Sequence, residues 1–279
     1  MRIYMLVIFI FLGALSYEYY ALNKQPRNSI LYQLQSKGKI AFKPDPEPGR
    51  PMSLWLGWGG LGLMVVMNVY SMRKRFSFMK NWGRMSSWMN FHIFCGLLGP
   101  VFILFHSNFK VRGLVAISFW SMVISFSSGI VGRYFFLQLS SRKADFDELG
   151  EKWIERLRRF LAKVKIEWQD GEVHEYLNRA LHLAGAPIDE FQSISPVGAI
   201  SRSFIGDLKM LFRSPDRPAH WPQATVIPLK EYAVAKRRAA LVGSFQQLMG
   251  YWHAFHFPFA VFMYLTAIVH VIAALVFGL

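Results

Sequence analysis

The sequence predicts an all-α membrane protein: a bundle of about five transmembrane helices with a mostly helical soluble insert. Three observations predict this class. The 279-residue chain is 53% hydrophobic and only 18% charged, whereas soluble domains carry about 25% charged residues. Five stretches stay apolar for roughly the 20 residues that cross a bilayer. A long charged segment, residues 140–245, separates the fourth stretch from the fifth.

The five apolar stretches follow one another along the chain as Ile3–Tyr20, Leu54–Met72, Trp88–Phe109, Leu114–Leu139 and Leu248–Leu279. They predict an N-terminal transmembrane anchor at 1–22, an outer loop at 23–53, transmembrane helices two to four at 54–139, a helical insert at 140–245 and a last transmembrane helix at 246–279. The alternative for the first stretch is a cleaved signal peptide. We favour an uncleaved anchor, because no clean A-x-A cleavage site follows it.

Charge sets the expected orientation. Lys and Arg in short loops favour the cytoplasmic side, and the side that holds the N-terminus and the edges of the insert carries eleven of them against eight on the other side. We therefore expect a multi-pass protein of the bacterial inner membrane with the N-terminus and the 140–245 insert in the cytoplasm. The C-terminus is expected in the periplasm.

The net charge of +15 would suggest a nucleic-acid partner in a soluble protein. Here the insert holds 17 basic and 14 acidic residues, so most of the surplus flanks the apolar stretches. That distribution is typical of contact with anionic lipid, so membrane lipid is the expected partner and nucleic acid is not. A single cysteine, Cys95, excludes an internal disulfide, multi-cysteine metal sites and CxxCH attachment of haem.

The insert has few motifs of its own. Apolar residues recur at three and four positions over Asp145–Lys165, which predicts an amphipathic helix. Prolines divide its middle, and a basic helix is expected from Leu229 into the last apolar stretch. It contains no GxGxxG or P-loop sequence. A platform for partner subunits and a structural filler are both consistent with this pattern.

The apolar stretches contain histidines, whose side chains can ionise or bind a metal. Ionisable residues there indicate function by default. The third stretch carries His92 and His106, and the fifth carries His256 and His270, and the members of each pair are fourteen positions apart. Fourteen residues are almost four helical turns, so both members face nearly the same way, about 21 Å apart. The two helices run in the same direction, which sets His92 level with His256 and His106 level with His270.

Such facing pairs predict metal ligation. Two imidazoles on opposite faces of a b-type haem give a six-coordinate, electron-transferring iron. We therefore expect two haem b groups, held by His92 with His256 and by His106 with His270. A lone intramembrane histidine is more often a hydrogen-bond partner between helices, but the equal spacing of two pairs favours ligation.

Four further residues are candidates for cofactor binding. Gly96 and Gly99 would let a porphyrin approach the third helix, unless they serve helix packing. Arg133 would pair with a haem propionate, unless it only reaches for the membrane surface. His253, three residues before His256, is an alternative ligand, a propionate or quinone partner, or the start of a proton path. The matched spacing favours His256 as the ligand.

The chain resembles the di-haem membrane cytochromes b, including ferric reductase-type membrane domains, in its paired histidines on two parallel helices. The segments Phe91–Leu98, Leu104–Ser107 and Trp252–Pro258 are more narrowly similar to bacterial small cytochrome b subunits. The resemblance covers the third to fifth apolar stretches. It implies an electron-transfer subunit of an oxidoreductase complex, with a multihaem cytochrome c or a flavin or iron–sulfur protein as partner and a quinone as a further expected reactant. We expect no flavin- or nucleotide-binding domain after the fifth stretch, unlike in ferric reductases.

Two other functions use the same histidines. A membrane metalloenzyme would bind iron, copper or zinc, which requires ligands that converge on one point. A transporter or assembly subunit would use them to relay protons or to pack. The separation of the pairs by about 21 Å disfavours a single metal site.

Overall fold

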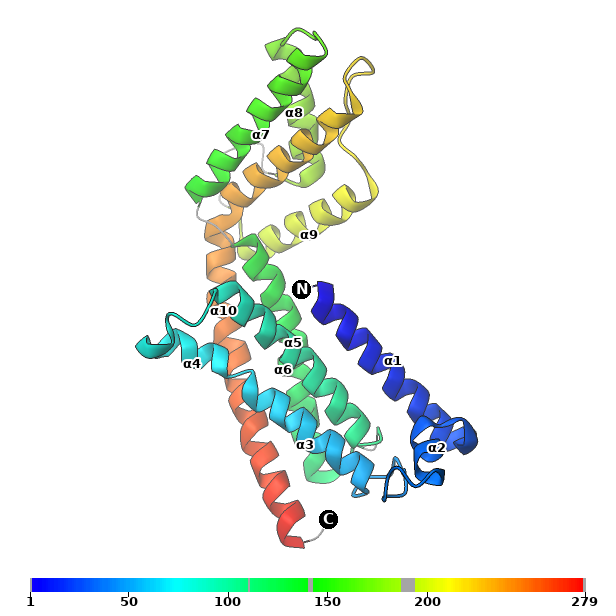
Figure 1. Cartoon of the computed structure of the whole chain (residues 1–279). Helices are drawn as coiled ribbons and strands as arrows, with labels where there is room; N and C mark the ends of the chain where they lie inside the picture. The colour runs from blue at the N-terminus through cyan, green and yellow to red at the C-terminus, as the bar shows by residue number, and fades with distance from the viewer. Residues whose placement is uncertain (1, 110, 140–142, 187–193, 278–279) are drawn as a thin grey trace. The chain divides into compact units, whose positions relative to one another are not determined.

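The computed structural model describes residues 2–109, 111–139, 143–186 and 194–277, and the regular elements in these ranges are all helices (Figure 1). The predicted all-α class is confirmed for this part of the chain. The chain forms two compact units, Met1–Ile130 with His256–Leu279, and Val131–Phe255. Of the residues named or counted above, Lys110, Arg142 and Leu279 lie outside the described ranges.

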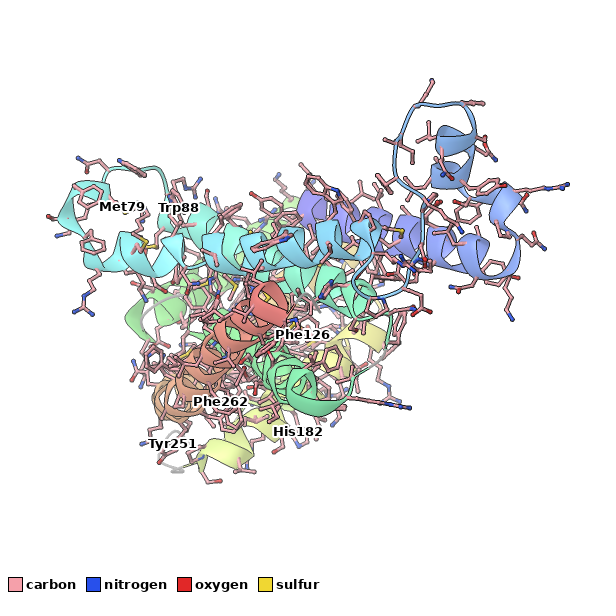
Figure 2. The ribbon with its side chains drawn as sticks, turned by 90° about the horizontal axis from the view of Figure 1, so that it is seen from below. Met79, Trp88, Phe126, His182, Tyr251 and Phe262 are labelled. Atoms are coloured by element: carbon pink, nitrogen blue, oxygen red, sulfur yellow. The ribbon has the colours of Figure 1, made fainter. Side chains whose placement is uncertain are left out.

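Five helical segments are long and apolar enough to cross a membrane. They are α1 (Arg2–Lys24), α3 with α4 (Pro51–Val66 and Val69–Arg75), α5 (Met85–His106), α6 (Gly113–Gln138) and α10 (Val226–Phe277). Each overlaps one predicted apolar stretch, but α5 ends at His106 and α6 at Gln138, before the predicted ends at Phe109 and Leu139. Large apolar side chains on these helices remain exposed, among them Phe262 of α10, which Figure 2 labels.

Helices α3 and α5 pack closely in the first unit. A Cβ atom at Gly60 would lie 3.0 Å from the Gly99 carbonyl oxygen, and one at Gly99 would lie 2.9 Å from Met64 Cγ. Such distances leave no room for a side chain, so the two backbones approach each other directly, as small residues allow in helix pairs. Met64 also belongs to a buried cluster with Met122 of α6 and Met263 of α10. Helices α3, α6 and α10 therefore meet in one core.

The second predicted apolar stretch is not one continuous helix. The structure interrupts it at residues 67 and 68, between α3 and α4. The Asn68 amide donates to the Met64 carbonyl at 3.0 Å and to the Val65 carbonyl at 3.3 Å. Asparagine side chains compete in this way with backbone hydrogen bonds. The break is therefore a local effect of one polar residue within an apolar run.

The segment after α4 contains the short helix η2 (Ser77–Met79) and is held by a buried arginine. Arg73 is only 5% exposed, and its guanidinium donates to the Lys80, Trp82 and Gly83 carbonyls. Arg73 is one of the eleven basic residues counted above for the orientation in the membrane. In the structure it also fixes the connection between α4 and α5.

The predicted outer loop also contains structure. It forms η1 (Pro26–Asn28) and α2 (Ile30–Ser36), which the sequence pattern did not predict. Buried Glu18 of α1 accepts hydrogen bonds from the Ser29 hydroxyl and from the N–H groups of Ile30 at 3.0 Å and Leu31 at 2.9 Å. A carboxylate at this end satisfies N–H groups that lack partners within the helix.

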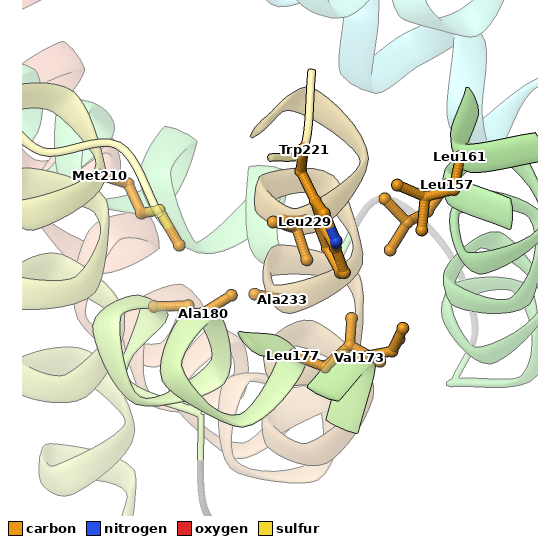
Figure 3. Close-up of a cluster of buried hydrophobic side chains, with 10 residues drawn as sticks. Leu157, Leu161, Val173, Leu177, Ala180, Met210, Trp221, Leu229 and Ala233 are labelled. Atoms are coloured by element: carbon orange, nitrogen blue, oxygen red, sulfur yellow. The ribbon is translucent and has the colours of Figure 1, made fainter. Parts of the chain in front are cut away.

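The second unit combines the end of α6, the first half of α10 and the insert. The insert forms α7 (Lys143–Lys163), α8 (Asp170–Ala184), α9 (Pro196–Phe212) and η3 (Gln223–Thr225). Figure 3 shows its core around Trp221, which is 2% exposed. The rest of this core comes from α7, α8, α9 and α10: Leu157, Leu161, Val173, Leu177, Ala180, Ala184, Met210, Leu229 and Ala233. The insert is thus a folded unit with its own core.

The unit extends beyond the predicted boundaries of 140 and 245. Phe135 of α6 packs with Leu241, Phe245 and Leu248 of α10 and with Ala199 of α9. Because α10 is continuous from Val226, the basic helix expected from Leu229 and the fifth apolar stretch are one element.

Candidate functional site

His106 is held at the end of α5 by Ser53 of α3. Ser53 is fully buried. Its carbonyl oxygen lies 2.8 Å from His106 Nδ1, and its hydroxyl donates to the His106 carbonyl at 2.8 Å. A carbonyl oxygen can only accept, so Nδ1 carries the proton and Nε2 keeps its lone pair in the neutral ring. Metal-ligating histidines are oriented in the same way by a partner on the second nitrogen.

The structure brings the rings of His106 and His270 together, as the spacing predicts. Their centres are 6.5 Å apart and their planes are inclined at 63°. Two imidazoles on opposite sides of one metal ion would have ring centres about 6.4 Å apart, given metal–nitrogen bonds of about 2.0 Å and about 1.2 Å from nitrogen to ring centre. The observed separation of the two ring centres is of this size.

A glycine of α3 makes room for the His106 ring. A Cβ atom at Gly57 would lie 2.8 Å from His106 Nδ1 and 2.9 Å from Cε1. Real Cβ atoms do not approach that closely, so the ring occupies its position because residue 57 has no side chain.

His92 is held by the break between α3 and α4. Its Nδ1 lies 3.0 Å from the Met67 carbonyl, and its ring centre lies 5.4 Å from that of Tyr70. At the break, the Met67 carbonyl accepts from the Tyr70 N–H at 3.3 Å rather than from the residue four positions on. The carbonyl therefore remains accessible to His92 and fixes its proton on Nδ1 as well.

His256 of α10 is held by a serine of α6. Its Nδ1 lies 2.6 Å from Ser128 Oγ, and the Ser128 hydroxyl donates to the Ser125 carbonyl at 2.9 Å. With the hydroxyl proton on the Ser125 carbonyl, Oγ accepts from the His256 Nδ1–H. Each of the three rings is anchored through Nδ1, and for His106 and His92 the carbonyl partner fixes the proton there.

The structure places the glycine candidates on the α3 side of α5. Gly99 faces Met64 and Gly60, and a Cβ atom at Gly96 would lie 3.5 Å from Met67 Sδ. The contacts described for both are contacts with α3. Their role beside a porphyrin stays a prediction.

The two remaining candidates belong to the second unit. Arg133 is half-buried, and its guanidinium lies 5.9 Å from the Phe136 ring centre. His253 is exposed, with its ring centre 6.3 Å from that of Trp252, whereas His256 belongs to the first unit.

Sequence reasoning missed the groups that anchor the rings: Ser53, Gly57, the Met67 carbonyl and Ser128. For Gly57 and Ser128 the available signal was a small residue inside an apolar stretch, whereas Ser53 lies in the predicted outer loop and Met67 acts through its backbone carbonyl. The histidine partners of Ser53, Met67 and Ser128 lie 53, 25 and 128 positions away. Only the fold brings them together.

No three His, Cys, Asp or Glu side chains of the described ranges are grouped so that they could hold a metal ion. A haem iron needs only two side-chain ligands, because the porphyrin supplies the others. No known family model, curated protein or solved structure matches this chain.

Proposed function

We propose that the chain is a di-haem b-type cytochrome subunit that carries electrons across the bacterial inner membrane. The observation that carries the proposal is the His106–His270 pair, with ring centres 6.5 Å apart and His106 Nδ1 anchored on Ser53. The five long apolar helices supply a membrane setting for it.

The proposal assigns four histidines to two haem groups. His106 and His270, whose rings the structure brings together, would hold one, and His92 and His256 would hold the other, at levels about 21 Å apart. Bound haem supplies a one-electron redox centre at each level. Ser53, Ser128 and the Met67 carbonyl fix the tautomer and orientation of the ligating rings, which raises ligand basicity. The exchange of electrons with partner redox subunits, and with a quinone, is part of the same proposal.

A redox titration of the purified full chain tests the function. Protein expressed with ample haem is titrated while the visible spectrum is recorded, with and without a quinone analogue, and haem is counted per chain. Two haems with separable midpoint potentials are expected. Haem-free protein that binds zinc or copper would favour a metalloenzyme instead, and haem-free, metal-free protein would favour a proton-relaying or packing role.

Gly57→Ala is expected to lower haem content from two toward one per chain. The new Cβ atom would meet the His106 ring, which must leave the position it holds beside His270. Gly62→Ala on the same helix is the matched control, because a Cβ atom there meets nothing within 4 Å. Pyridine haemochrome analysis of both proteins measures the difference. Equal haem content would show that the ring position is not needed for binding.

Ser128→Ala is expected to weaken haem binding at the His92–His256 level by about 10–100-fold, the usual cost of losing an outer-shell partner. The His256 ring loses the acceptor at 2.6 Å that orients it. Transfer of haem to apomyoglobin measures the retention. Ser127→Ala, at the exposed neighbouring position, is expected to retain haem as the parent does. Identical transfer rates in all three proteins would refute the role of Ser128.

A further inference from the structure

Helix α9 has two apolar faces, of which only one is covered. Its buried face, formed by Ala199, Ser203, Gly206 and Met210, packs into the second unit. The opposite face is exposed by 47 to 79% per side chain and consists of large apolar residues: Val197, Phe204, Ile205, Leu208, Leu211 and Phe212. An exposed face of this size marks contact with something outside the described structure.

Helix α9 contacts α6 and α10 near the ends of their predicted apolar stretches. Ala199 packs against Phe135 of α6 and Leu248 of α10. Asp207 accepts from the Tyr134 hydroxyl of α6 at 3.0 Å. Tyr134 and Phe135 lie within the last turns of the apolar segment that ends at Gln138. If α6 and α10 cross a bilayer, α9 is bound at its surface.

A row of cations borders the exposed face. Arg202, Lys209 and Arg213 follow at spacings of seven and four, which places them on one side of α9. Lys209 and Arg213 also line a cavity of about 660 Å³ with Arg179, His182, Leu183, Ser214 and Asp216. Three cations against one carboxylate give this cavity a net positive charge.

We infer that α9 lies in the surface of the membrane, with its exposed face in the acyl boundary and its Lys209–Arg213 cavity around the phosphate of an anionic phospholipid. A helix with one apolar face and flanking Lys and Arg has this arrangement at membrane interfaces. A second copy on the same face would bring its own Arg202, Lys209 and Arg213 against these cations, which disfavours self-association. The inference requires the membrane setting but not the haem.

Spin labels measure the depth of α9 in full-length protein. On a Cys95→Ala background, Leu208→Cys is labelled with a nitroxide in phosphatidylcholine vesicles that contain phosphatidylglycerol. Val164→Cys, in the turn that follows α7, is the matched control, because Val164 is 48% and Leu208 47% exposed. We expect the label at 208 to collide with oxygen but not with a water-soluble nickel chelate, and the label at 164 to do the reverse. Equal nickel access at both positions would overturn the inference, as would spin–spin broadening at 208, which would indicate a second copy.

Two changes test the charged cavity. One is a variant that combines Lys209→Gln with Arg213→Gln, both at exposed positions, and the other is a change in the lipid composition of the vesicles. Loss of nickel protection at 208 is expected on this change, or when phosphatidylglycerol is omitted. Added inorganic phosphate is expected to leave the protection intact, and reversal by phosphate would show a site for the free anion and overturn the lipid assignment. A nitroxide at Phe262→Cys on α10 tests the membrane setting separately, because access of the nickel chelate to that label would refute it. The haem content of the same samples tests the proposed function independently.

Discussion

A His106→Ala variant is expected to bind one haem per chain where the parent binds two. Alanine removes a proposed haem ligand whose ring centre lies 6.5 Å from that of His270, while His92 and His256 keep their anchors on Met67 and Ser128. Haem per chain by pyridine haemochrome analysis and the number of midpoint potentials in a redox titration measure the loss. His270→Ala is expected to give the same result, because the two rings would share one iron.

A variant with both His106→Ala and His270→Ala tests whether the two residues hold the same haem. If His106 and His270 hold the same haem, replacing both is expected to lose no more haem than either replacement alone. Loss of both haems in a single variant that keeps its helical circular dichroism would contradict independent sites. His182→Ala, at an exposed position of the second unit, serves as the control and is expected to keep two haems.

His253 tests the alternative ligand at the other level. It is exposed, whereas His256 is half-buried and hydrogen-bonded to Ser128. His253→Ala is therefore expected to keep both haems, and His256→Ala to lose one. The opposite result would assign the ligand to His253.

Much of the fold follows from hydropathy, because length and apolar content decide which segments become long helices. The departures have local physical causes. Asn68 interrupts the second apolar stretch because its amide takes backbone carbonyls, and Glu18 organises α2 through contacts across 11 to 13 residues. Neither effect appears in a periodicity. The boundaries of the insert differ from the predicted ones for a similar reason. Because Phe135 packs with Phe245, the end of α6 and the first half of α10 belong to the second unit.

The candidate site, too, was only partly predictable from the sequence. The fourteen-residue spacing predicted that His106 would meet His270, because helix geometry relates spacing to direction. The tautomers were not predictable, since they depend on Ser53, the Met67 carbonyl and Ser128, which helix packing brings to the rings. Gly99 illustrates the limit of reasoning from residue type: a small residue suits a porphyrin and a helix neighbour equally, and the structure gives it a helix neighbour.

Asp207→Asn is expected to destabilise the second unit by about 2–3 kcal/mol, near the lower end for breaking a buried ion pair because Asp207 is partly exposed and screened. Arg237 has no exposed side-chain surface, and Asp207, 38% exposed, is its acidic partner. The guanidinium also donates to the Ala184 carbonyl at 2.8 Å and the Ser203 carbonyl at 3.2 Å. Without the carboxylate, a buried positive charge loses its counter-charge while its desolvation remains.

Hydrogen exchange in the full chain measures this effect, because it reports the opening of α8 and α9 separately from the first unit. Amide protection in both helices is expected to fall roughly 30–150-fold in Asp207→Asn, the factor that corresponds to about 2–3 kcal/mol. Asp216→Asn, at an exposed position, is expected to change protection by less than about twofold. Arg237→Met combined with Asp207→Asn is expected to be more protected than Asp207→Asn alone, because it removes the buried charge along with its partner. Equal deprotection of the single and the combined variants would contradict a cost from the unpaired charge and would place it in the hydrogen bonds that Asp207 accepts from Arg237 and Tyr134.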